Sequence, residues 1–207
     1  YRIAPVSVAK SEKAEFLRRA SEAAKAYDPI ISQTSASYGD VHKNIWIANS
    51  TGLYRSDDRT RTRFMIEAVA SSGGEKQSGY FAPGSGKGYE FIESFPVEDT
   101  AREAARVAVT MISAKPSRSG KMPVIIDNGF GGVIFHEACG HSLEATSVGI
   151  HASVFSDKLG EQIASPLVTA IDDGTKPGEW GSIAIDDEGH ISSHNVLIKE
   201  GILSGYM

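Results

Sequence analysis

The chain has 207 residues, a net charge of -5 and one cysteine, and 41% of its residues are hydrophobic. The acidic balance argues against nucleic-acid binding as the main function, and no segment is apolar for the length that crosses a bilayer. A single cysteine excludes an internal disulfide and favours a reducing compartment, so we expect a cytoplasmic protein without a membrane partner.

The first half of the sequence predicts one helix followed by strands. Residues 10–27 place apolar side chains at steps of three and four, with Ser11 as a plausible N-cap. Residues 30–69 alternate polar and apolar side chains between short turns, which indicates an antiparallel meander. The Gly- and Ser-rich residues 71–90 predict a surface loop or a long hairpin.

The second half predicts two further helices. An alanine-rich apolar stripe indicates a helix over residues 97–114, and residues 122–126 read as a short, nearly buried strand. A Gly-rich turn then leads into a helix over about residues 133–148, and hairpins follow. Dinucleotide binding at this turn is disfavoured because Ile134 interrupts the glycine pattern.

These elements predict an α+β fold of antiparallel sheets with a few packed helices. We expect residues 1–95 to form part of an N-terminal α+β domain, and residues 96–207 to begin a second domain. The chain starts at Tyr1 without a methionine and stops just after a predicted strand and turn, so we expect both domains to be incomplete.

The most informative segment is His136-Glu137-Ala138-Cys139-Gly140-His141. Imidazoles are common zinc ligands, and a glutamate beside one of them can act as general base for a water molecule. The histidines are five residues apart, which an ideal helix places about 140° apart. We therefore expect a π-like irregularity at residues 139–141, helped by the permissive Gly140. The alternative is two unrelated histidines on opposite faces of a surface helix.

This motif and several later turns resemble the TldD/PmbA metallopeptidase family, in its metal-bearing TldD-like branch. The resemblance also rests on Gly131-Gly132-Val133, Leu143-Glu144-Ala145, Asp172-Asp173-Gly174-Thr175 and the segment 201–207. It implies a zinc-dependent peptidase that acts on unstructured or modified peptides, together with a PmbA-like subunit or a second copy. By the same resemblance, His136 and His141 are zinc ligands and Glu137 is the catalytic base. The family's third ligand is a cysteine beyond this chain, so the site here is expected to be incomplete.

Alternatives stay open for Glu144, for Cys139 and for the function of the chain. Glu144 could orient an imidazole, replace the third ligand or be an ordinary solvated carboxylate. Cys139 is better read as a small apolar packing residue than as a ligand. The main alternative function is a non-catalytic binding or assembly module of a two-subunit complex, and another is a metal-binding regulator that does not hydrolyse peptides.

Overall fold

The computed structural model describes residues 1–207, with the side chain of Phe130 excepted. By its internal contacts the chain forms two compact units. The first comprises residues 1–117 and 176–190, and the second comprises residues 118–175 and 191–207. Each unit is α+β with an antiparallel sheet, as the sequence predicts. The expected domain division at residues 95 and 96 stays a prediction.

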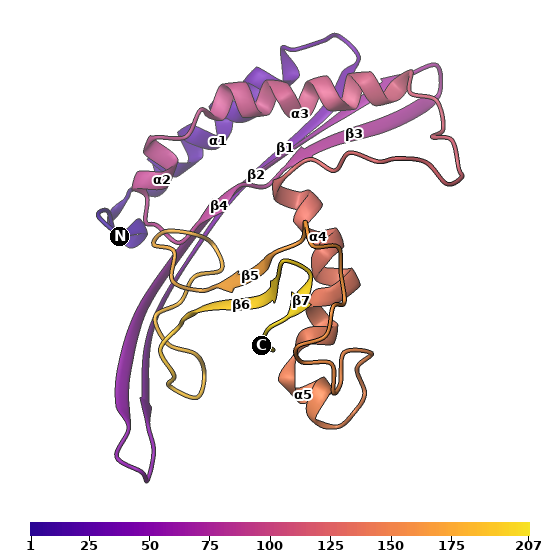
Figure 1. The fold of residues 1–207 in the computed structure, drawn as a ribbon. Coiled ribbons are helices and arrows are strands. Elements are labelled where there is room, and N and C mark those ends of the chain that lie inside the picture. The colour runs from indigo at the N-terminus through magenta and orange to yellow at the C-terminus, as the bar shows by residue number, and fades with distance from the viewer. The chain divides into compact units, whose positions relative to one another are not determined.

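The first unit packs helices on one face of an antiparallel sheet (Figure 1). Its sheet has the strand order β1-β2-β3, with β4 also pairing with β2. Its elements in chain order are η1 (Pro5–Ser7), α1 (Lys10–Lys25), β1 (Ile31–Ala48), β2 (Tyr54–Ser72), β3 (Glu75–Phe81), β4 (Gly84–Ser85), α2 (Glu90–Glu93) and α3 (Val97–Ile112).

The two long helices of this unit agree with the sequence pattern. Helix α1 ends two residues earlier than expected, and its N-cap is Ala9 rather than Ser11. Helix α3 buries its predicted alanine stripe completely. Because these side chains are small, α3 approaches the sheet so closely that a Cβ on Gly79 would lie 1.9 Å from the Ala104 carbonyl oxygen.

The strands differ from the expected meander in length and number. Residues 31–72 form only two strands, β1 and β2, which pair along nearly their whole length. The even-numbered residues of β2 from Thr60 to Ala70 are buried. This part of β2 therefore packs against the core with one face of the strand. The predicted loop 71–90 contains strand β3, which confirms the hairpin alternative.

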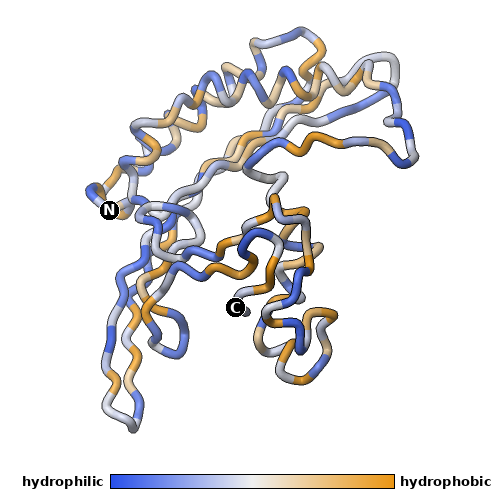
Figure 2. Tube along the Cα trace, viewed as in Figure 1, coloured by the Kyte–Doolittle hydropathy of each residue, from blue (hydrophilic) through white to orange (hydrophobic). Residues whose placement is uncertain are grey.

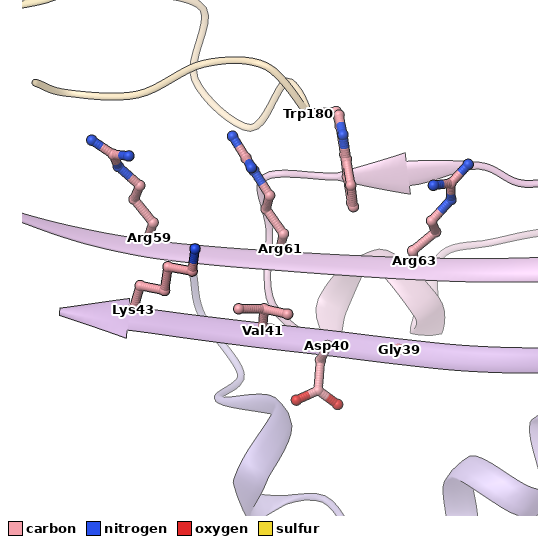
Figure 3. Close-up of a pocket in the computed structure, with 8 residues that line it drawn as sticks. All are labelled: Gly39, Asp40, Val41, Lys43, Arg59, Arg61, Arg63 and Trp180. Carbon is pink, nitrogen blue, oxygen red and sulfur yellow. The ribbon is translucent and has the colours of Figure 1, made fainter. Parts of the chain in front are cut away.

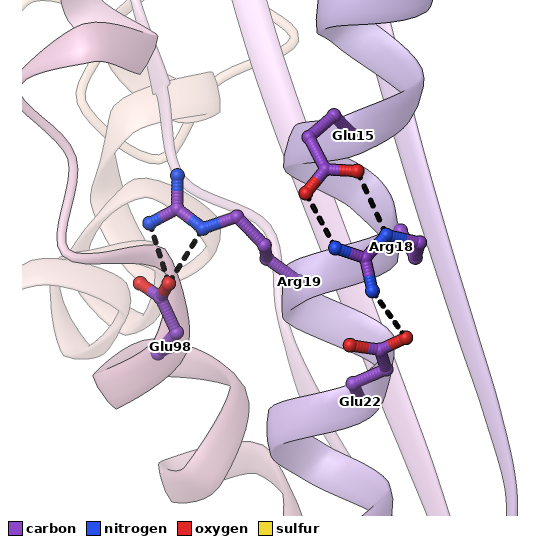
Figure 4. Close-up of polar contacts among 5 residues, drawn as sticks. All are labelled: Glu15, Arg18, Arg19, Glu22 and Glu98. Carbon is purple, nitrogen blue, oxygen red and sulfur yellow. Dashed lines mark hydrogen bonds and ion pairs between the residues drawn. The ribbon is translucent and has the colours of Figure 1, made fainter.

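In the first unit, aromatic packing joins α1 to the sheet, and an ion pair joins α1 to α3. Phe64 on β2 contacts Phe16 edge-on, with ring centroids 5.1 Å apart. On the surface, Arg19 of α1 donates to Glu98 of α3 over 2.6 Å. Arg18 lies between Glu15 and Glu22 on α1 and pairs with both (Figure 4). Exposed pairs of this kind contribute about 0.2–1 kcal/mol each, so the apolar core carries most of the stability.

The second unit has a small sheet of strand order β5-β6-β7 and a chain of short helical turns. Its elements are η2 (Gly129–Gly131), α4 (Gly132–Phe135), the π-helical turn η3 (His136–Gly140), η4 (His141–Leu143), α5 (Ala145–Gly149), β5 (Ala170–Asp173), β6 (His194–Lys199) and β7 (Ile202–Leu203). No helix in the part of the chain described is both long and apolar enough to pass through a membrane.

Two expectations for the second unit were wrong. Residues 122–126 form no strand, and Ile125 is fully exposed. Figure 2 shows this stretch as a hydrophobic run between α3 and α4. A buried strand needs hydrogen-bonding neighbours, and no described strand pairs with this stretch. The expected continuous helix 133–148 is broken at Glu144, whose backbone is extended.

Candidate metal centre

The His-Glu-His motif lies on the helical turns of the second unit, and the sheet beside it fixes their position. Leu143 is completely buried and packs with Leu197, Ile198 and Leu203 from the sheet. Cys139 is half-buried against the same core, as expected for a small packing residue. The opposite side of these turns, which carries His136, Glu137 and His141, is exposed.

A π-helical turn brings the two histidines together. The His141 backbone N–H donates to the His136 carbonyl oxygen, which is an i→i+5 hydrogen bond. This bond adds one residue to the turn and removes the offset of an ideal helix. The two imidazole centroids lie 4.3 Å apart. The expected helical irregularity is therefore present, although the π-helical turn begins three residues before the predicted 139–141.

Gly140 leaves room for the first imidazole. Its φ of -54° is ordinary for a helix, so the glycine is not required by backbone conformation. A Cβ at this position would instead lie 3.1 Å from His136 Nδ1. Such a contact is tighter than most side chains tolerate, so the missing Cβ keeps the ring of His136 close to the turn.

Glu137 and Glu144 approach His141 from two sides. Glu137 Oε2 lies 3.9 Å from His141 Nε2, and Glu144 Oε1 lies 2.8 Å from His141 Nδ1. Because an ionised carboxylate only accepts hydrogen bonds, Nδ1 is the donor to Glu144 and carries the proton. Donation of this hydrogen bond to the Glu144 carboxylate raises the pKa of His141. Nε2 is then left free to act as a ligand.

The three side chains of the motif fit a small cation. One potential ligand atom from each of His136, Glu137 and His141 lies within 4.8 Å of the others. Two zinc-bound nitrogens in a tetrahedral site are about 3.4 Å apart, given Zn–N bonds of about 2.0–2.1 Å. The donor set of two imidazoles and a carboxylate also suits zinc chemically. Small side-chain movements would bring the ligand atoms from within 4.8 Å to the spacing of a zinc site.

Two family models together match almost the whole chain. Residues 3–112 match the PmbA/TldA metallopeptidase central domain, and residues 119–207 match the C-terminal domain of the same family. The fold is thus that of the PmbA/TldA metallopeptidase family, and the chain carries an exposed His-Glu-His cluster that could hold a metal ion. The chain belongs to the PmbA/TldD family, as its motifs suggest.

Individual relatives agree with this assignment. The chain is similar to a Haemophilus influenzae metalloprotease TldD homolog, with 38% identity over 97% of this chain and 43% of that protein. Its fold matches a Thermotoga maritima structure described as a proposed modulator of a DNA gyrase, with TM-score 0.87, 24% identity and coverage of 100% and 47% of the two chains. It also matches TldE from Thermococcus kodakarensis, with TM-score 0.73, 19% identity and coverage of 100% and 47%. The chain therefore spans less than half the length of these relatives.

Proposed function

We propose that this chain carries part of the active site of a zinc-dependent peptidase that hydrolyses unstructured or modified peptides. The observation that supports it most directly is the convergence of His136, Glu137 and His141 on the π-helical turn. Relatives of the chain are named metalloproteases, which supports a peptidase role in general. The single cysteine supports action in the cytoplasm.

In this proposal His136 and His141 hold the metal and Glu137 moves the proton. Bound zinc supplies Lewis acidity toward the peptide carbonyl. Glu137 accepts a proton from the attacking water at a carboxylate oxygen, while the remaining hydroxide adds to the carbonyl carbon. When the C–N bond breaks, Glu137 returns that proton to the leaving amine. Glu144 holds His141 through Nδ1, so that Nε2 would be the nitrogen that holds the metal.

The third protein ligand is proposed to lie outside these residues. A catalytic zinc usually has three protein ligands, and the cluster supplies two histidines if Glu137 serves as base. The relatives are more than twice as long as this chain, so they contain further segments that could supply the ligand. Glu144 as a substitute ligand is the alternative within the chain, although its pairing with Nδ1 of His141 favours the orienting role.

The apolar run at residues 122–126 favours a second, compatible role in assembly. Val124 and Ile125 are 73% and 100% exposed, which is unusual for adjacent large apolar residues. We propose that this surface is covered in the longer protein or in its complex with a PmbA-like subunit or a second copy.

Glu137→Gln in the longer protein tests the peptidase proposal. We expect zinc content by plasma mass spectrometry to stay unchanged, while kcat/KM for a flexible fluorogenic peptide falls by about 100- to 10,000-fold. Glu161→Gln, at another exposed glutamate of the same unit, is the matched control. If Glu137→Gln retains full hydrolysis, Glu137 is not the base. If the wild-type protein binds zinc but hydrolyses no peptide, the assembly role takes precedence.

A further inference from the structure

A cationic groove lies in the first unit, on the face of the β1–β2 hairpin opposite the buried core. Its cavity volume is about 380 Å³. Figure 3 shows its lining residues, which come from β1, β2 and the segment 176–190 of the same unit. They are Gly39, Asp40, Val41, Lys43, Arg59, Arg61, Arg63 and Trp180.

Strand register creates the row of cations. Arg59, Arg61 and Arg63 occupy alternate positions on β2, so their side chains leave the same face of the sheet (Figure 3). Lys43 on β1 pairs with Arg59 in the register and adds a fourth cation. Gly39, opposite Arg63, has no atom within 4 Å of the place where a Cβ would stand, which leaves the floor open beside Arg63.

Trp180 holds two of these cations in place. The guanidinium groups of Arg61 and Arg63 lie 5.5 and 5.6 Å from the centre of its ring, at cation–π distance. Figure 3 shows the indole standing between the two arginines. The ring fits because residue 84 is glycine, where a Cβ would lie 2.6 Å from Trp180 Cε3. Arg63 Nε donates to the Ala82 carbonyl oxygen over 3.3 Å, which leaves the terminal N–H groups of Arg63 and the Arg61 guanidinium available to a ligand.

Most of the positive charge in the groove is not neutralised. Arg59 is paired with Asp57 over 2.6 Å and also donates to the Ile185 carbonyl oxygen. Asp40 points to the other side of the sheet (Figure 3). There it pairs with Lys13 over 3.0 Å. Among the side chains that the structure describes, Lys43, Arg61 and Arg63 have no carboxylate within ion-pair distance. Such a cluster is notable in a chain whose net charge is -5.

We propose that this groove binds an extended acidic peptide segment with carboxylates at alternate positions. Residues two apart on a strand are about 6.8 Å apart, so Arg61 and Arg63 match carboxylates on every second residue of an extended peptide. Guanidinium groups bind carboxylates through paired hydrogen bonds. The two arginines occupy both sides of the Trp180 ring, so no open face remains for stacking a nucleic-acid base.

Binding of a labelled peptide tests this proposal without requiring metal or hydrolysis. The probe is a fluorescein-labelled peptide of alternating Glu and Thr, measured by fluorescence anisotropy with the 207-residue chain. We expect salt-sensitive binding that becomes about tenfold or more weaker in the Arg61→Gln/Arg63→Gln variant. The Arg102→Gln/Arg106→Gln variant removes the same charge from α3 of the same unit and should bind normally.

Three outcomes would overturn the proposal. The first is equal binding of a peptide with Gln in place of Glu. The second is unchanged binding by the Arg61→Gln/Arg63→Gln variant. The third is that a single-stranded oligothymidylate binds more tightly than the acidic peptide and that this variant loses that binding, which would assign the groove to nucleic acid.

If the double variant does not fold, the variant Lys43→Gln, at an exposed residue, tests the proposal instead. Its affinity for the acidic peptide is expected to fall by about threefold. Because this assay needs no zinc, a negative binding result leaves the peptidase proposal intact. Likewise, a negative result in the Glu137→Gln experiment leaves the groove proposal intact.

Discussion

Glu144 Oε1 lies 2.8 Å from Nδ1 of His141, on the side of the imidazole opposite the nitrogen that faces Glu137. The hydrogen bond passes across the break in the helix, since Glu144 is extended while His141 is helical. The break thus places a carboxylate where it can select the tautomer of a proposed ligand. Glu144 could orient this imidazole, replace the third metal ligand or be an ordinary solvated carboxylate. The hydrogen bond to Nδ1 favours the orienting role.

We expect Glu144→Gln in the longer protein to weaken zinc affinity by about 10- to 100-fold, because the amide still accepts from Nδ1–H but carries no charge. Competition with a chelating zinc indicator measures the affinity. Complete loss of zinc would identify Glu144 as a direct ligand. Unchanged affinity, equal to that of Glu161→Gln, would identify an ordinary solvated carboxylate.

His141→Ala should reduce the zinc content of the longer protein to near zero, because one of two imidazole ligands is removed. His194→Ala is the matched control, since His194 is a half-exposed histidine of the same unit that pairs with Asp173 instead. Plasma mass spectrometry after dialysis gives the metal content. Stoichiometric zinc in His141→Ala would mean that the metal lies elsewhere.

Gly140→Ala should weaken zinc binding while leaving the fold intact. The new Cβ would lie 3.1 Å from His136 Nδ1 and push the ring away from the turn, for an expected loss of about tenfold in affinity. Helix propensity favours alanine over glycine by about 1 kcal/mol, so thermal stability should not fall. Gly149→Ala has free space and serves as control. Lowered stability with unchanged zinc affinity would contradict this explanation.

Gly79→Ala should destabilise the first unit, because its Cβ would lie 1.9 Å from the backbone oxygen of Ala104. Separation of β3 from α3 should cost about 1–3 kcal/mol. Both tryptophans belong to this unit, so urea unfolding followed by tryptophan fluorescence reports its stability selectively. Gly39→Ala, on the same sheet with nothing within 4 Å, should be nearly neutral. Equal stability of the two variants would show that α3 adjusts freely.

The stability of the first unit should depend on pH through Glu90, which is 7% exposed. Burial alone would raise the pKa of Glu90, but hydrogen bonds from the backbone N–H groups of Arg2, Ile3 and Gly88 outweigh it and lower the pKa to about 2. A lowered pKa means that the stabilisation is complete above the unfolded value of about 4.5 and is lost as pH falls toward 2.

Glu90→Gln should remove this part of the pH dependence. Above pH 5 the variant should be less stable by up to about 3 kcal/mol, and the difference should shrink steadily toward pH 2. Urea unfolding followed by tryptophan fluorescence gives both curves. Glu93→Gln, at the other acidic residue of α2, is the control. A difference that does not vary with pH would indicate a packing effect instead of an ionised carboxylate.

Local sequence patterns determined the two long helices α1 and α3 and the π-helical turn of the motif. The alanine spacing of residues 97–112 defines a buried stripe whatever it packs against, because 3.6 residues per turn places those side chains on one face. The five-residue separation of His136 and His141 likewise predicts a π-helical turn, since only an added residue aligns them. The family resemblance follows from the same short-range residues.

Long-range pairing decided the rest. Residues 122–126 are as apolar as a core strand, but strand formation depends on partners that local sequence does not specify, and the structure leaves them unpaired and exposed. The alternation of Arg59, Arg61 and Arg63 is visible in the sequence, yet its meaning depends on Trp180, more than a hundred residues later. Sequence alone therefore determined the turns and side-chain types of the candidate metal centre. Only the tertiary structure assembled the cationic groove, because its charges, its aromatic ring and its open floor come from segments that meet only on folding.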